Sequence, residues 1–218
     1  MKQGSGASRV VWGILVASVM IWGQLAWAGE TNATPVNGTQ PVADPPAPPA
    51  PGPTCVPEGT GNKLGDLLAD FELTNCNGEK VTLQSRCGKV KALWVMFGTG
   101  WCPACGEYAP VMADQYAKYK DKGLDVAVLL GEDNNGAPVT PAYCKKYAKS
   151  HKIDPSMVYV MTWKAVNTTW DTCKAQYIPW VAIHDGRDMK YLFSNQCQST
   201  AGFADETAAI QSLIPDYQ

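Results

Sequence analysis

An almost continuous apolar run from Val90 to Gly98, VKALWVMFG, constrains the fold more than any other part of the sequence. A run of this kind, rich in β-forming residues, is typical of a strand buried on both faces. A second run, LDVAVLL at 124–130, follows helix-forming residues at 103–121 and a stop signal at Gly123. Two buried strands joined through a helix predict a parallel pair with a right-handed crossover, and helices on both faces of the sheet.

Shorter elements are predicted before and after this unit. The Asn77-Gly78 turn signal predicts a hairpin ahead of the first buried strand. The other predicted elements are the hairpin strands 71–75 and 80–83, a helix at 141–151, a strand at 157–161, a second hairpin of 180–184 with 189–193, and a closing helix at 204–213. The expected fold class is therefore α/β, with a mixed central sheet flanked by helices.

Residues 1–28 have the pattern of a secretory signal peptide. Lys2 and Arg9 supply the positive start, an apolar stretch follows, and Ala26-Trp27-Ala28 offers a cleavage site before Gly29. The alternative is an uncleaved membrane anchor, because the apolar stretch is barely long enough to span a bilayer. Export is expected in either case, to the periplasm or an equivalent space.

The segment at 29–54 is proline-rich and has almost no large apolar side chains. Such a chain buries too little surface to offset its ordering entropy, which predicts a disordered linker. The folded domain is therefore expected at 55–218. The net charge of −2 and the 17% of charged residues give no general field for nucleic acid or for an anionic membrane.

Eight cysteines follow the export signal, an even number that indicates an oxidised chain with structural bridges. The alternative is a set of free buried thiols. Two of the eight, Cys102 and Cys105, form a CxxC motif. The six candidates for structural disulfides are Cys55, Cys76, Cys87, Cys144, Cys173 and Cys197.

The CxxC motif lies where the first buried strand ends and the next helix begins. Unpaired amide groups and the helix dipole at this point stabilise a thiolate, so Cys102 is predicted to have a lowered pKa and to be the attacking sulfur. Cys105, three positions on, lies on the same helical face and can resolve a mixed disulfide. Pro103 occupies the first helical turn, where its missing N–H costs nothing.

Two other interpretations of the motif are a static bridge and half of a zinc site. A zinc site needs a second cysteine pair or nearby histidines. The sequence has no other CxxC and only His151 and His184, and His184 is expected in a strand at the edge of the core. A c-type haem is excluded because Gly106 follows Cys105 where that motif has histidine. We expect neither a metal nor a separate cofactor.

Several motifs together resemble the exported thiol–disulfide oxidoreductases of the TlpA/ResA-like (redoxin) family. The resemblance spans roughly Leu64 to Leu213 and is carried by DFELTNCNGEKVTL, ALWVMFGTGWCPAC, Pro110 eight residues after the first cysteine, and YIPWVAIHDGRD. It implies a thioredoxin-like, three-layer fold with an N-terminal hairpin extension.

The resemblance also implies how the active site is shaped. It places a cis peptide at Ile178–Pro179, facing the cysteines, where the adjacent backbone can pair with an extended client chain. A trans proline at a strand start is the alternative. It places Trp101 beside the sulfurs as part of the docking surface, against the alternative of a core tryptophan. Ala104 completes the intervening pair, and Met96 stands where thioredoxins keep a buried acid.

The pairing of the remaining six cysteines is open, since about fifteen arrangements exist. Cys76 and Cys87 flank the first predicted hairpin, so we expect them to approach each other. A bridge between Cys144 and Cys173 would staple the segment between them to the core. Cys197 competes for Cys173, and the remaining cysteine takes whichever partner is left.

The sequence therefore predicts a thiol–disulfide oxidoreductase that acts on protein disulfides through Cys102 and Cys105, in the reducing direction. Its partners would be client proteins and a second redox protein, for which a membrane-bound protein is one candidate. A copper chaperone is disfavoured because such relatives use CxxxC with a distant histidine. A binding domain in which the CxxC is only a static disulfide is an open alternative. A peroxidase is disfavoured because the lone threonine-flanked cysteine of those relatives is missing.

Overall fold

The structure is a computed structural model that describes residues 54–169, 176–196 and 202–218. The expected signal peptide at 1–28, nearly all of the expected linker, and Cys173 and Cys197 lie outside the described residues. Within the described ranges, no helix combines the length and apolar character that a membrane crossing requires.

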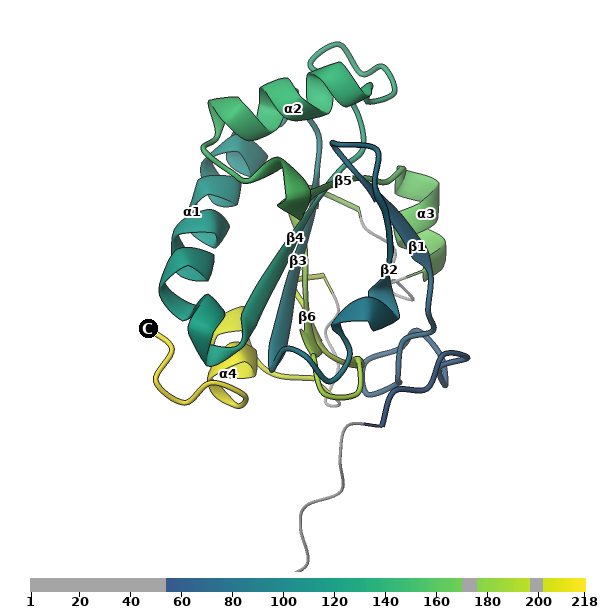
Figure 1. Ribbon diagram of the computed structural model, residues 1–218, viewed down its shortest axis with the longest axis vertical. Coiled ribbons are helices and arrows are strands. Elements are labelled where there is room, and N and C mark those ends of the chain that lie inside the picture. The colour runs from purple at the N-terminus through teal and green to yellow at the C-terminus, as the bar shows by residue number, and fades with distance from the viewer. Residues whose placement is uncertain (1–53, 170–175, 197–201) are drawn as a thin grey trace, which may run out of the picture. The chain divides into compact units, whose positions relative to one another are not determined.

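A mixed sheet forms the centre of the domain (Figure 1). In the described part of the chain it has seven strands in the order β2-β1-β5-β4-β3-β6-β7. β3 pairs in parallel with β4, and β4 with β5, while the other neighbours are antiparallel. The strands are β1 (Glu72–Asn75), β2 (Lys80–Thr82), β3 (Ala92–Gly98), β4 (Leu124–Leu130), β5 (Val158–Val160), β6 (Trp180–Asp185) and β7 (Lys190–Ser194).

Helices cover both faces of this sheet, which confirms the predicted three-layer α/β fold. α1, α2 and α4 pack on one face, and α3 with the 3-10 helix Leu83–Arg86 packs on the other. Figure 1 shows α1 and α3 on opposite sides of the strands. The helices are α1 (Pro103–Tyr119), α2 (Pro141–Ser150), α3 (Trp163–Thr169) and α4 (Glu206–Gln211).

The alternation of side chains along β3 produces the two cores. Trp94 and Met96 point to the α1 face, while Val95 and Phe97 point to the α3 face. Every residue of β3 is buried, as the apolar run predicts. A strand covered on both faces must be apolar throughout, because neither row of side chains reaches water.

α3 was not predicted, and its residues explain why. Its sequence, WKAVNTT, contains β-branched residues and asparagine, which have weak helix propensity. Tertiary contacts replace that propensity, since Val166 is fully buried and the ring of Trp163 packs edge-on against Phe97 with centroids 4.8 Å apart.

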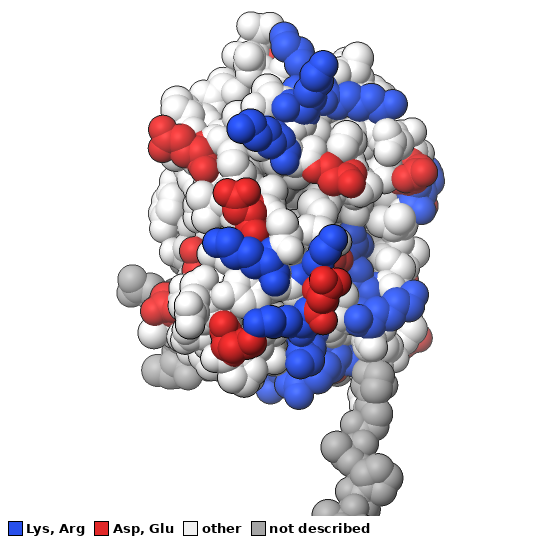
Figure 2. All heavy atoms as spheres, turned by 60° about the vertical axis from the view of Figure 1, so that its left-hand side comes forward, with Lys and Arg blue, Asp and Glu red and all other residues white. Residues whose placement is uncertain are grey.

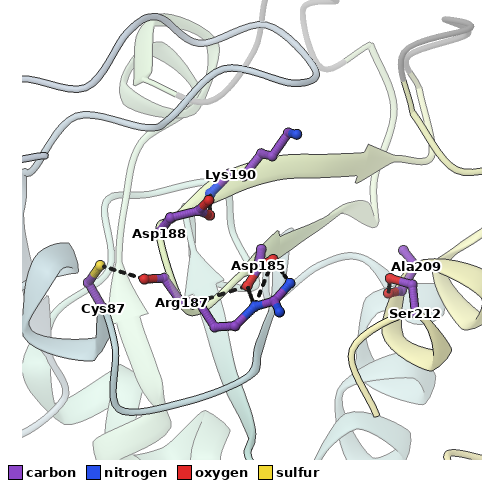
Figure 3. A network of polar contacts seen from close by, with 7 residues as sticks. All are labelled: Cys87, Asp185, Arg187, Asp188, Lys190, Ala209 and Ser212. Carbon is purple, nitrogen blue, oxygen red and sulfur yellow. Dashed lines mark hydrogen bonds and ion pairs between the residues drawn. The ribbon is translucent and has the colours of Figure 1, made fainter. Parts of the chain in front are cut away.

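A polar network holds the turn between β6 and β7 (Figure 3). The Asp185 carboxylate accepts hydrogen bonds from the backbone N–H of Arg187 at 3.0 Å and from its Nε at 2.8 Å. The Asp188 carboxylate accepts from the backbone N–H of Lys190 at 2.9 Å. Cys87 Sγ contacts the Arg187 carbonyl oxygen at 3.6 Å, so the turn also abuts the segment that leads into β3.

The buried His184 makes the stability of the fold depend on pH. Burial lowers the pKa of its imidazole to about 3, and the ring stacks on Tyr191 with centroids 4.8 Å apart. Free histidine has a pKa of about 6.5. Below that pH, His184 binds a proton in the unfolded chain and stays neutral in the folded chain. The free energy of unfolding should therefore fall on acidification, by up to about 1.4 kcal/mol per pH unit.

Urea unfolding of the oxidised protein between about pH 7 and pH 5 measures this slope. His184→Phe should flatten it, because the substitution removes the titrating group and keeps an aromatic ring. His151→Gln is the matched control and should keep the slope, because it leaves His184 in place. An unchanged slope in His184→Phe would contradict the assignment.

Candidate active site

The CxxC motif begins α1 at the sheet edge where β3 ends. Cys102 is the N-cap residue, with extended backbone angles, and its Sγ accepts a hydrogen bond from the backbone N–H of Cys105 at 3.1 Å. Pro103 fills the first helical position, where a missing N–H is tolerated. The arrangement directs an otherwise unpaired helix-start amide at the first sulfur.

The two motif cysteines form a disulfide with a Cα–Cα distance of 5.3 Å. Cys102 is 6% exposed and Cys105 is wholly buried, so an incoming sulfur can reach only Cys102. Gly98 makes room for the pair, because a Cβ atom there would lie 2.8 Å from Cys105 Sγ. Met96 is buried in the same core, so an apolar side chain occupies the position that thioredoxins give to an acid.

The segment that opens β6 lies at the same edge. The Ile178–Pro179 peptide bond is cis. Because Phe97 pairs with Trp180 in the antiparallel register of β3 and β6, Pro179 lies level with the end of β3. Asn195, the residue after β7, holds this segment, since its Nδ2 donates to the Pro179 carbonyl oxygen at 2.9 Å.

Trp101 is 47% exposed and is therefore not a core tryptophan. Its Nε1–H donates to the Glu132 carboxylate at 2.7 Å, and the N–H of Gly100 donates to the Glu132 carbonyl oxygen at 2.8 Å. Sequence reasoning missed Glu132. It could have been found because it lies two residues after the second buried strand, and the carboxyl ends of parallel strands meet at one edge.

α2 borders the motif on its other side. A Cβ atom on Gly100 would lie 1.9 Å from the Tyr143 hydroxyl, and one on Gly106 would lie 2.9 Å from Cε1 of His151. Side chains from α2 and its carboxyl end therefore contact the backbone both before and after the two cysteines. No spacing in the sequence signals these contacts, because they depend on how α2 packs.

A half-buried polar pair further along α1 fixes that helix against α4. The Tyr108 hydroxyl donates to the Glu206 carboxylate, and the Tyr108 ring packs edge-on against Trp94 with centroids 5.8 Å apart. Burial raises the pKa of the Glu206 carboxyl above its ordinary value. Glu107, next to Tyr108 in the sequence, is exposed.

The predicted Cys76–Cys87 bridge is wrong. Cys87 pairs with Cys55, at a Cα–Cα distance of 5.9 Å. Cys76 lies in the turn after β1, whereas Cys87 follows the 3-10 helix beyond the end of β2, so the two lie at opposite ends of the hairpin. Residues that flank a hairpin in sequence do not meet when one of them belongs to its turn.

The predicted Cys144–Cys173 bridge is also wrong. Cys144 pairs with Cys76, at a Cα–Cα distance of 5.2 Å, and both residues are fully buried. Cys144 lies on the inner face of α2, which turns it toward the sheet. The bridge staples α2 to the end of β1. Four of the six candidates thus form structural disulfides, and the pairing of Cys173 and Cys197 lies outside the described residues.

Fold and site together define a class: a thioredoxin-fold protein with a CxxC disulfide where α1 begins. Residues 64–165 match the AhpC/TSA family. The thiol-disulfide oxidoreductase ResA of Bacillus thuringiensis (strain Al Hakam) is 29% identical over 73 residues, which are 34% of this chain and 41% of that protein. ResA of Bacillus subtilis (strain 168) is 36% identical over 69 residues, which are 31% of this chain and 37% of that protein.

A solved structure supports the same fold. A putative protein disulfide isomerase from Bacteroides thetaiotaomicron superposes with a TM-score of 0.55 at 19% identity, covering 72% of this chain and 94% of that one. This likeness confirms the thioredoxin-like fold. The matches to ResA confirm the resemblance to TlpA/ResA-like oxidoreductases, although this chain spans only about two fifths of the length of those relatives.

Removing the Cys76–Cys144 disulfide should destabilise the domain. The Cys76→Ala, Cys144→Ala double variant should lose roughly 2–5 kcal/mol of unfolding free energy, because the bridge spans a sequence separation of 68 residues and limits the unfolded chain. Urea unfolding measures the loss. Cys55→Ala with Cys87→Ala is the control, with a separation of only 32 residues and a smaller expected loss. A larger loss in the control would contradict the argument.

Proposed function

We propose that this protein is a thiol–disulfide oxidoreductase that reduces disulfides of exported client proteins through Cys102 and Cys105. The observation that carries the proposal is the position of Cys102, which caps α1, accepts the Cys105 amide and is bonded to Cys105. A sulfur in this position is stabilised as a thiolate by the helix-start amides, and thiolates are the attacking species in disulfide exchange.

In the first step, the Cys102 thiolate of the reduced protein attacks one sulfur of a client disulfide. A bond forms between Cys102 and the client, and the other client sulfur leaves as a thiolate. In the second step, Cys105 loses its proton and attacks Cys102. The Cys102–Cys105 disulfide forms, the second client thiolate leaves, and two electrons have passed to the client.

Completing the cycle requires a dithiol partner protein that returns two electrons to the Cys102–Cys105 disulfide. Trp101 and the segment at Ile178–Pro179 flank the motif and would hold the client, with Trp101 offering an exposed indole and the extended segment offering backbone groups. Pro103 and Ala104 separate the two sulfurs and shape the loop between them.

Two features support an oxidising compartment, such as the periplasm. The described residues hold two structural disulfides besides the motif, and such bridges persist in exported proteins. The pattern at 1–28 would direct the chain there.

In the described residues, no group of three or more His, Cys, Asp or Glu side chains is placed to hold a metal ion.

Substitution of the two motif cysteines tests the mechanism. Cys102→Ala should reduce insulin reduction to the background rate, because the nucleophile is lost. Cys105→Ala should accumulate a mixed disulfide between Cys102 and the client, visible by non-reducing electrophoresis, because nothing resolves it. In the reduced protein, the pKa of the Cys102 thiol should lie below the value of about 8.5 that is typical of free cysteine.

Glu107→Gln is the control for this series, since Glu107 is exposed and adjacent to the motif. It should keep the activity of the unaltered protein. Insulin reduction by Cys102→Ala at the rate of the unaltered protein would rule out the proposed role of this residue.

Graded reduction distinguishes an enzyme from a binding domain with a static bridge. Cys102 and Cys105 should be alkylated at lower dithiothreitol concentrations than Cys76 and Cys144, because that structural pair is fully buried. Mass spectrometry of the labelled peptides gives the order. If Cys76 and Cys144 were alkylated at lower dithiothreitol concentrations than Cys102 and Cys105, the CxxC would be a static structural disulfide.

A further inference from the structure

A basic surface on α2 and the turn after it lies beside the motif and takes no part in the mechanism above. We define this lysine ridge as Lys145, Lys146, Lys149 and Lys152, all of which are exposed. No Asp or Glu occurs between Asp133 and Asp154, although the whole chain carries a net charge of −2. In Figure 2, Lys and Arg side chains gather at the upper end of the molecule, where Figure 1 places α2.

Helix stability does not account for this ridge. Lys145 and Lys149 are four positions apart, a spacing at which like charges repel along a helix. Only Lys149 lies in the last turn, where a cation complements the helix dipole. Among the described residues, none of the four lysines takes part in an ion pair. Their charge is therefore available to a partner.

The ridge adjoins the active site through the contacts of α2 with the motif loop. A cavity of about 160 Å³ lies at this junction. Gly100 lines it from the motif side, and Lys146, Tyr147 and His151 line it from the side of α2.

Lys146, in the lining of this cavity, is a suitable partner for a carboxylate. Its ammonium would supply the opposite charge and donate charge-assisted hydrogen bonds. The cavity has room for the carboxylate end of one side chain. The ridge that continues from it would attract further acidic residues of the same segment.

We propose that the lysine ridge and the adjoining cavity bind an acidic segment next to the reacting cysteine of a client or partner protein. One carboxylate enters the cavity beside Lys146, and neighbouring Asp or Glu side chains lie along Lys145 and Lys149. The proposal rests on the oxidoreductase function, and it adds that acidic substrates are preferred.

Two synthetic peptides with the same disulfide test the preference, one flanked by glutamates and the other by glutamines. The full-length protein should reduce the glutamate peptide with a kcat/KM on the order of tenfold higher at low ionic strength. The ratio should approach one at about 1 M salt, where the Debye length is about 3 Å. A ratio of one at low ionic strength would overturn the proposal.

Variants locate the effect on the ridge. Replacing Lys145, Lys146 and Lys149 with Gln should bring the ratio close to one. The matched control replaces Lys89, Lys118 and Lys120 with Gln, which removes the same charge from exposed positions at the far end of β3 and α1 and should keep the ratio. If both triple variants lower the ratio equally, overall charge and not the ridge determines it.

Lys146→Gln tests the cavity. It should lower the ratio more than Lys152→Gln does, because of the two only Lys146 lines the cavity. Equal ratios in the two variants would overturn the placement of the carboxylate.

The remaining outcomes separate this inference from the proposed function. If neither peptide is reduced, the oxidoreductase function is wrong. The ridge is then tested by fluorescence anisotropy, which measures binding of versions of both peptides in which serine replaces each cysteine. Tighter binding of the glutamate version, lost in the ridge variant, supports it. A different result would be that both peptides are reduced or bound equally well, while the protein sediments with phosphatidylserine vesicles and the ridge variant does not. That result would assign the ridge to a lipid surface and overturn the proposal.

Discussion

The burial of β3 on both faces is the constraint on which the site depends. Trp94 and Met96 pack under α1, and Val95 and Phe97 pack under α3, so the strand cannot shift its register without exposing one of the two rows. Its pairing with β4 and β6 then fixes where each neighbour ends. As a result, the motif loop, the backbone after β4 and the segment before β6 all meet at one edge of the sheet.

At that edge, one side chain has two roles. Cys102 caps α1 by accepting the amide of Cys105, and the same sulfur forms the motif disulfide. The capping interaction favours negative charge on the sulfur, so the feature that begins the helix is also the feature that activates the nucleophile. The Cys76–Cys144 disulfide supports the site from further away, because it anchors the helix that borders Gly100 and Gly106.

Local and periodic signals were sufficient for most of the fold. The apolar runs around β3 and β4 identify buried strands because any strand covered on both faces must look that way. The CxxC at a helix start indicates redox chemistry because both the dipole and the spacing are properties of a few adjacent residues. α3 escaped prediction, since Trp163 and Val166 form a helix through contacts with the core and not through propensity.

The sequence by itself determined the α/β class, the position of the motif between β3 and α1, and the resemblance to TlpA/ResA-like oxidoreductases. Only the tertiary structure decided which cysteines pair, because a disulfide requires two Cα atoms within about 7 Å and sequence distance does not report that. It also decided that Tyr143 and His151 contact the motif loop. Those contacts arise from the packing of α2 against residues some forty positions away in the chain, which no local pattern encodes.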